Sequence, residues 1–161
     1  MNKRIKKKQR QLRNKKLYKR YPFLAIRNWR TDEPIGYEFT YLDDMPDGWR
    51  KAFGKDMCEE IRRVLIKANY LNKYRVVQVK EKYGSLRWYD GCAPSSIFHE
   101  LQDVINKYEE ISERTCIRCG RPATRISLGW ISPWCDECAE RLSDRVQFRK
   151  LEKRNGEIKW K

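Results

Sequence analysis

The chain has 161 residues, of which 40% are hydrophobic and 37% are charged, and its formal net charge is +15. This length suffices for one compact domain plus a small metal-stabilised module, and the apolar content is sufficient for a core. No apolar run reaches the roughly 18 residues that span a bilayer, and no secretory apolar stretch follows the basic N-terminus, so we expect a soluble, cytoplasmic protein.

Positive charge is concentrated at the two ends of the chain. Residues 1–20 contain 11 Lys or Arg and no acid, and residues 141–161 contain 8 basic and 3 acidic residues. The interval 21–140 is close to neutral, with 18 basic and 19 acidic residues. Clustered cations gain free energy by displacing counterions from a phosphate backbone. The distribution therefore predicts a nucleic-acid partner, DNA or RNA.

Residues 1–20 have too few aliphatic side chains for a buried helical stripe, so we expect a basic arm that is disordered or only partly helical. A tail that serves only solubility is the alternative, but so many cations without an anion repel one another unless a polyanion is near. The arm supplies the first candidate nucleic-acid contacts: Lys3, Arg4, Lys6, Lys7, Lys8, Arg10, Arg13, Lys15, Lys16, Lys19 and Arg20.

Residues 21–113 are predicted to form an α+β body. The segment 20–34 is aromatic and is interrupted by prolines, so we expect it to cross the core without regular structure. In residues 36–44, Tyr37, Phe39 and Tyr41 alternate with other residues, which is the period of a half-buried strand.

Two amphipathic helices and a hairpin follow in the body. Asp47 is placed to cap a helix from about Trp49 to Tyr70. Residues 74–90 indicate two strands joined by a turn at which Gly84 can take a positive φ. A second helix is predicted from Ser95 or Ser96 to about Glu113. The expected fold class is therefore α+β, a small antiparallel sheet packed by two amphipathic helices.

Four cysteines carry the strongest chemical signal in the sequence, with the spacing Cys116-x2-Cys119-x15-Cys135-x2-Cys138. A gap of two residues lets both thiolates of a pair face one ion, and two pairs complete a tetrahedral shell. Residues 114–161 are thus predicted to be a module held by one Zn2+ ion, against the alternative of buried or redox-active cysteines.

The order of elements in this module favours a treble clef, with a zinc ribbon as the alternative. Gly120 follows the first pair, β-forming residues flank Gly129, and residues 139–153 suggest a helix. The basic residues of that helix are further candidates for nucleic-acid contact, with a solvated helix face as the alternative: Arg141, Arg145, Arg149 and Lys150.

We predict no catalytic residue. Four thiolates leave no coordination position open for water or substrate, which indicates a structural ion. His99 is the only histidine, and no nucleophile motif accompanies it. A nuclease is therefore the least favoured function. Cys58, in the first long helix, is expected to be a core residue.

The phrases RYPFLAIRNW, MPDGWRKAFG, VKEKYGSLRWY, CIRCGRPAT and GWISPWCDEC resemble a group of small zinc-knuckle proteins encoded by phages and prophage-bearing bacteria. The resemblance covers about residues 20–140. It implies a zinc knuckle, a phage or mobile-element setting, and action against host machinery or defence.

Two hypotheses follow from the sequence. The first is a non-enzymatic, zinc-stabilised accessory protein that binds nucleic acid through its basic ends. The second is an inhibitor that binds a host nuclease, polymerase or defence complex through its neutral body.

Overall fold

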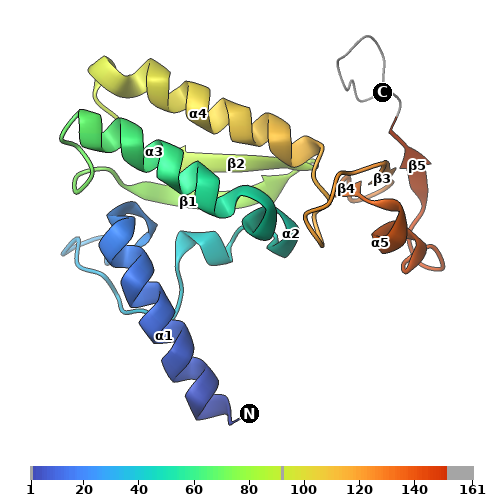
Figure 1. Cartoon of the computed structure of the whole chain (residues 1–161), viewed down its shortest axis with the longest axis horizontal. Coiled ribbons are helices and arrows are strands. Elements are labelled where there is room, and N and C mark those ends of the chain that lie inside the picture. Colours follow the sequence, from blue (N-terminus) through green and yellow to red (C-terminus); the bar gives the residue numbers. More distant parts are fainter. Residues whose placement is uncertain (1, 92, 152–161) are drawn as a thin grey trace.

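A computed structural model describes residues 2–91 and 93–151 (Figure 1). An α+β body is followed by a small module that contains three short strands and a cluster of four cysteines. The predicted fold class is thereby confirmed. The end of the predicted zinc module, residues 152–161, and Cys92 lie outside the described residues.

Both predicted long helices of the body are confirmed. The first is built from three consecutive elements: α2 (Asp47–Trp49), the π-helical turn η3 (Arg50–Gly54) and α3 (Lys55–Lys67). The second is α4 (Ser95–Glu113). Pro46 occupies the N-cap position that we assigned to Asp47, whose carboxylate lies instead in the first turn, near the positive end of the helix dipole.

The predicted hairpin is also confirmed. β1 (Val76–Lys82) pairs antiparallel with β2 (Ser85–Asp90), and the turn between them places both Tyr83 and Gly84 at positive φ. α3 and α4 pack against each other, and α4 packs on β2, so the two helices cover one side of the hairpin (Figure 1). Within the described residues, these two strands form the sheet of the body.

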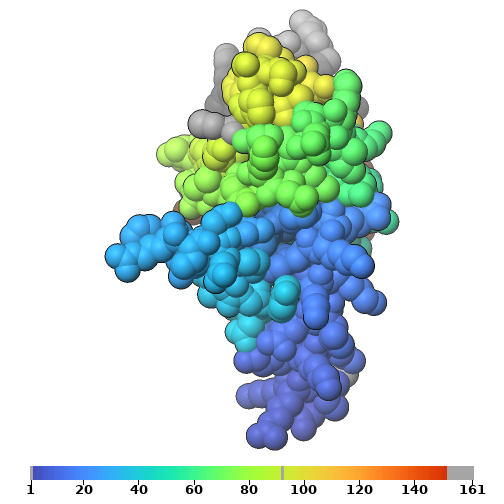
Figure 2. Space-filling view, turned by 90° about the vertical axis from the view of Figure 1, so that its left-hand side faces the viewer, coloured from blue at the N-terminus to red at the C-terminus, as the bar shows by residue number. Residues whose placement is uncertain are grey.

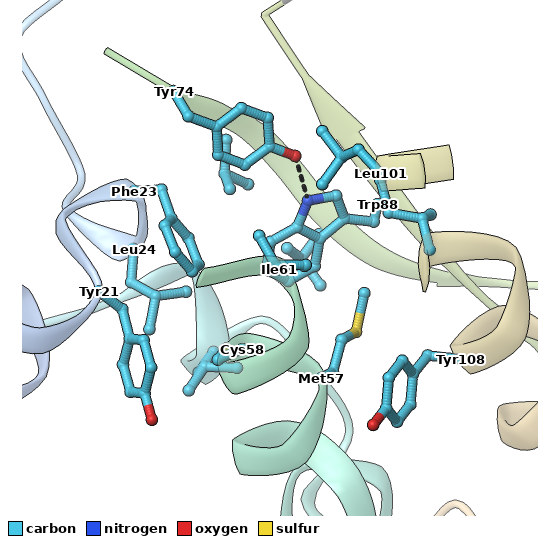
Figure 3. Packing of buried hydrophobic residues seen from close by; sticks show 14 of the residues in the cluster. Tyr21, Phe23, Leu24, Met57, Cys58, Ile61, Tyr74, Trp88, Leu101 and Tyr108 are labelled. Atoms are coloured by element: carbon cyan, nitrogen blue, oxygen red, sulfur yellow. Dashed lines mark hydrogen bonds between the residues drawn. The ribbon is translucent and has the colours of Figure 1, made fainter. Parts of the chain in front are cut away.

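The core lies between the hairpin and the helices (Figure 3). Met57 and Ile61 of α3 are fully buried, as the predicted apolar face requires. Trp88 Nε1 donates to the Tyr74 hydroxyl at 3.1 Å, and that hydroxyl donates to Asp90 Oδ2 at 2.6 Å. Both aromatic residues can therefore be buried without an unsatisfied polar atom.

Residues 3–20 form a continuous helix, α1 (Lys3–Arg20), which is more helical than the arm that we expected. Asn2 caps it by accepting from Arg4 N at 3.0 Å. Its C-terminal half packs on the body through two buried side chains, Asn14 and Tyr18, and its N-terminal half extends away from the body (Figure 1). Leu17 also packs on the core, but the two buried side chains of the contact are hydrogen-bonding ones, so a search for an aliphatic stripe could not find it.

The segment between α1 and α2 crosses the core irregularly, as predicted, with the 3-10 turns η1 (Pro22–Leu24) and η2 (Tyr41–Asp43). The strand predicted over residues 36–44 is wrong, because its β-type pairing in the described chain is limited to an isolated bridge between Ala25 and Thr40. The backbone carbonyls of Tyr37 and Phe39 instead accept hydrogen bonds from α1 side chains.

The C-terminal module contains β3 (Arg125–Ser127), β4 (Pro133–Trp134), α5 (Asp136–Glu140) and β5 (Phe148–Lys150), with strand order β4-β3-β5. The predicted hairpin around Gly129 is confirmed. The helix predicted over residues 139–153 is wrong for residues 141–151, because Phe148 packs edge-on against Trp134 and its strand pairs with β3. Residues 152 and 153 lie outside the described residues. Over the described ranges, no helix combines the length and apolar character needed to cross a bilayer.

Candidate metal centre

The four cysteines predicted from the sequence come together at one point of the C-terminal module. Their sulfur atoms all lie within 4.8 Å of one another, and the Cys119 and Cys135 sulfurs are 3.6 Å apart. A tetrahedral zinc site with bonds of about 2.3 Å would separate its sulfurs by about 3.8 Å. A disulfide requires about 2.05 Å, so these thiols are not paired covalently. The arrangement can hold one metal ion and is consistent with structural zinc.

Local backbone geometry orients each pair of thiols toward the centre of the four-cysteine cluster. In the first pair, Gly120 takes φ +82° and its N–H donates to the Cys116 carbonyl at 3.0 Å, which closes a tight knuckle. In the second pair, Cys135 caps α5 and Cys138 lies within that helix. The knuckle is joined to the hairpin because Ile117 N donates to Pro133 O at 2.9 Å. Both ligand pairs are thus held by one hydrogen-bonded unit.

Within this cluster, the pKa values of the Cys119, Cys135 and Cys138 thiols are shifted in different directions. Burial raises the pKa of Cys119, but hydrogen bonds from Arg121 outweigh it and lower that pKa to about 6. Burial raises the pKa of both Cys135 and Cys138. Arg121 also forms an ion pair with Glu137 of α5 at 2.6 Å, so its guanidinium links the two halves of the site. A metal ion must displace the remaining thiol protons, so its affinity decreases as pH falls.

The module lies against the start of α2, where two glycines allow a very close approach. A Cβ atom added at Gly48 would lie 2.2 Å from the Cys116 carbonyl oxygen, and one added at Gly120 would lie 2.6 Å from the Gly48 carbonyl oxygen. Real Cβ atoms essentially never come within 3.0 Å of such neighbours. Only glycine therefore permits this packing of backbone on backbone.

Hydrogen bonds complete this contact between the module and the body. Gly48 N donates to Ile117 O at 2.9 Å, and Trp49 Nε1 donates to Thr115 O at 2.8 Å. Trp49 is fully buried, so its indole N–H has no access to water and depends on this partner. The residue that precedes the cysteine knuckle therefore satisfies a polar group of the body's core.

The structure places the predicted nucleic-acid contacts of the arm along α1. Three of these cations form ion pairs with acids of the body: Lys7 with Glu38, Arg13 with Asp43, and Arg20 with Glu59. Two more lie over aromatic rings, Arg10 over Phe39 and Lys15 over Tyr37. The other six are exposed and have no intramolecular partner in the described part of the chain: Lys3, Arg4, Lys6, Lys8, Lys16 and Lys19.

The predicted contacts of the module lie around α5 and β5. Arg141 pairs with Glu137, and Arg145 pairs with Asp144. Arg149 and Lys150 lie exposed on β5. Because α5 is acidic, the field of these cations is weaker than that of α1.

The other residues considered for chemistry have structural surroundings. His99 is exposed on α4, with its ring against Phe98. Cys58 is fully buried, as predicted, and burial raises the pKa of its thiol.

Trp29 is a candidate that the sequence patterns did not indicate. Its side chain is 87% exposed, and the signal that could have revealed it is a large aromatic residue inside a polar, proline-bounded turn.

In comparisons with known proteins, no family model, curated protein or solved structure matches this chain. Geometry and charge are therefore the basis for assigning a function.

Proposed function

We propose that the chain is a non-enzymatic nucleic-acid-binding accessory protein whose C-terminal module is held together by one structural Zn2+ ion. The proposal depends chiefly on one observation, a preformed basic helix that projects from the body with six cations unpartnered within the described residues. A reduced four-cysteine site also suits the cytoplasm, where thiols stay reduced. The phage or mobile-element setting implied by the resemblance remains a prediction.

The shape and charge of α1 support nucleic acid as the partner. Its 18 residues are about 27 Å long, which is the length of about eight base pairs. Lys8, Lys16 and Lys19 are exposed and share one side of the helix, because residues three and eleven apart lie on one face. Since the helix is already formed, it does not lose backbone entropy on binding.

The cations of the module contribute less to this proposal. Arg121, Arg125 and Arg141 all pair with acids of α5, namely Glu137, Asp136 and Glu140. Counterion release requires cations that are free to neutralise phosphate. We therefore assign the main contact to α1.

The salt dependence of binding tests the assignment. We expect the logarithm of the association constant to fall with the logarithm of salt concentration with a slope of about −4 to −5, from six contacts at roughly 0.7–0.9 each. The triple variant Lys8→Gln/Lys16→Gln/Lys19→Gln should reduce the magnitude of the slope by about 2 to 3. The control Lys51→Gln/Lys55→Gln/Lys73→Gln removes the same formal charge from exposed positions of the body. Equal effects of the two triple variants would refute a role for α1.

The metal and the rival hypothesis are tested separately. Purified protein should contain one equivalent of zinc by elemental analysis, and a preparation without metal that keeps its module folded in a strong chelator would refute the structural ion. Capture from nuclease-treated bacterial lysate should yield no stoichiometric protein. A stoichiometric protein that persists would support the inhibitor hypothesis instead.

A further inference from the structure

We infer that Trp29 is a base-stacking side chain which, together with α1, forms a binding surface for single-stranded nucleic acid. This inference rests on the proposed function and specifies the form of nucleic acid that the surface takes. It starts from the most exposed large hydrophobic side chain in the described part of the chain, Trp29 at 87%. An exposed indole is a platform on which any unpaired base can stack.

Trp29 lies on a turn whose backbone is fixed by hydrogen bonds. Asn28 N donates to Glu33 O at 2.8 Å, and Asp32 N donates to Asn28 O at 2.9 Å. The Asn28 side chain accepts from Arg30 N at 2.8 Å. Outside the turn, an isolated bridge pairs Arg27 with Pro34. The indole is therefore presented by a rigid loop and binds without a large loss of backbone entropy.

The charges of the turn are compatible with an anionic strand. Arg75 holds Asp32 through two hydrogen bonds of 3.1 and 2.7 Å, and the Asp32 pKa is lowered mainly by this interaction. Glu38 pairs with Lys7. Among the acids of residues 26–40, all of which the structure describes, this leaves the Glu33 carboxylate without a partner, next to a surface that is otherwise neutral or basic.

Arg30 adds a cation at the indole itself. Its guanidinium carbon lies 5.1 Å from the centroid of the Trp29 ring, within the range of a cation–π contact. Because the indole is 87% exposed, most of its remaining surface is accessible to a base. A base that stacks on the free part of the indole would form a stack with the Trp29 ring and the Arg30 guanidinium. Arg30 would then also lie near the phosphate of that nucleotide.

Tyr18 connects the turn to the basic helix. The Tyr18 hydroxyl accepts from Ile26 N at 3.2 Å, at the base of the turn, and donates to Phe39 O at 2.7 Å. Asn14 Nδ2 donates to Tyr37 O at 2.9 Å. The same face of α1 therefore fixes the segment that carries Trp29.

Figure 2 shows the two elements as separate projections of the surface. α1 forms a dark blue column, and the turn, in the lighter blue of the bar, extends to one side, with a concave corner between them. The chain that follows the turn keeps Ile35 and Phe39 exposed, at 69% and 54%. Arg10 of α1 lies over the Phe39 ring at 5.1 Å. Between the helix and the turn, a cation thus lies on an exposed ring, a combination also found in grooves that follow a single strand.

The test compares Trp29→Ala and Trp29→Phe in the full-length, metal-loaded chain. The probes are fluorescein-labelled oligonucleotides of about 12 units, which is within the usual site size: oligo-dT, oligo-U and a DNA duplex of mixed sequence. Binding is measured by fluorescence anisotropy at several salt concentrations. Comparison of the affinities for oligo-dT and oligo-U shows whether the stacked base comes from DNA or from RNA. Phe98→Ala is the control, because Phe98 is an exposed ring on α4 at 45%.

We expect Trp29→Ala to weaken single-strand binding by about 5-fold to 100-fold, which corresponds to the loss of one stacked base. The salt slope should not change, because the phosphate contacts remain on α1. Trp29→Phe should recover most of the affinity. The duplex affinity should change less than about twofold for either variant, and Phe98→Ala should have no effect on any probe.

Three results would overturn the inference. Trp29→Ala could bind the single strands like the parent chain, or it could lose duplex affinity to the same extent. Loss of a captured protein partner with unchanged oligonucleotide affinity would place Trp29 in a protein interface. In each case the salt slope of the parent chain and its reduction in the α1 triple variant would still support nucleic-acid binding, so the two proposals fail separately.

Discussion

Gly48→Ala tests whether the metal module and the body are joined as the structure shows. The new methyl group would lie 2.2 Å from Cys116 O, so the two backbones would have to separate by at least 0.8 Å to reach the 3.0 Å limit. The hydrogen bonds from Gly48 N to Ile117 O and from Trp49 Nε1 to Thr115 O, now 2.9 and 2.8 Å, would then exceed 3.5 Å. Each buried bond lost costs about 1–3 kcal/mol, so we expect a total of about 2–6 kcal/mol for the two.

The same substitution at Gly54 is the matched control. An added Cβ there meets its nearest neighbours at 3.5 Å or more, and the position is helical without a positive φ. Gly54→Ala should therefore be neutral or stabilise by about 0.5–1 kcal/mol, because alanine restricts the unfolded chain. Urea unfolding of the metal-loaded chain, followed by tryptophan fluorescence, measures both variants. A Gly48→Ala chain within about 0.5 kcal/mol of the parent would refute the reasoning.

Three further predictions concern the ends of the structure and its ion pairs. Glu60→Gln should lower the free energy of unfolding by about 0.3–1 kcal/mol at pH 7, because Lys107 donates to that carboxylate at 2.7 Å but solvent screens this exposed ion pair. This hydrogen bond lowers the Glu60 pKa, so its contribution is complete above the unfolded value of 4.5, is lost as pH falls through the lower folded value, and should decrease in urea titrations carried out progressively below pH 4.5. Cys138→Ser removes one thiolate ligand, so elemental analysis should show less than one equivalent of metal and limited proteolysis should cut the module first. Tyr18→Phe removes the donor to Phe39 O and should cost about 1–3 kcal/mol, with faster amide hydrogen exchange in the turn that carries Trp29.

Elements in which buried apolar residues recur at regular intervals along the chain were predictable from the sequence. Apolar residues of α3 recur every three or four positions, and Met57, Ile61 and Leu65 are all fully buried. The cluster of four cysteines was predictable for a different reason. A two-residue gap fixes the distance between thiols within each pair, so the chemistry limits the local geometry directly.

The strand expected over residues 36–44 shows that an alternating pattern of aromatic residues can arise without a strand. The alternation of Tyr37 and Phe39 is real, but both rings lie under cations of α1, and their backbone carbonyls bind Asn14 and Tyr18. A helix 20 or more residues away in sequence therefore takes the role of the neighbouring strand. Nothing local in the sequence distinguishes these two partners.

The two ends were difficult to predict because their contacts depend on tertiary structure. α1 packs through Leu17 and through hydrogen bonds from the buried Asn14 and Tyr18, and a single aliphatic residue is too little for a hydrophobic pattern to register. At the other end, Phe148 finds Trp134 and the edge of β3, so a strand forms where local propensity suggested a helix. In both regions the partner becomes visible only when the chain is folded.

The paired glycines at the junction between the body and the C-terminal module also restrict how such a chain can evolve. Gly48 and Gly120 come from different halves, yet each presents bare backbone to the other half. A lineage that replaced the cysteine knuckle with another module would lose the need for glycine at 48. One that kept the knuckle but enlarged residue 48 would have to attach it elsewhere. If related sequences retain or lose the two glycines together, this co-occurrence would therefore identify, from sequence alone, which chains share the junction.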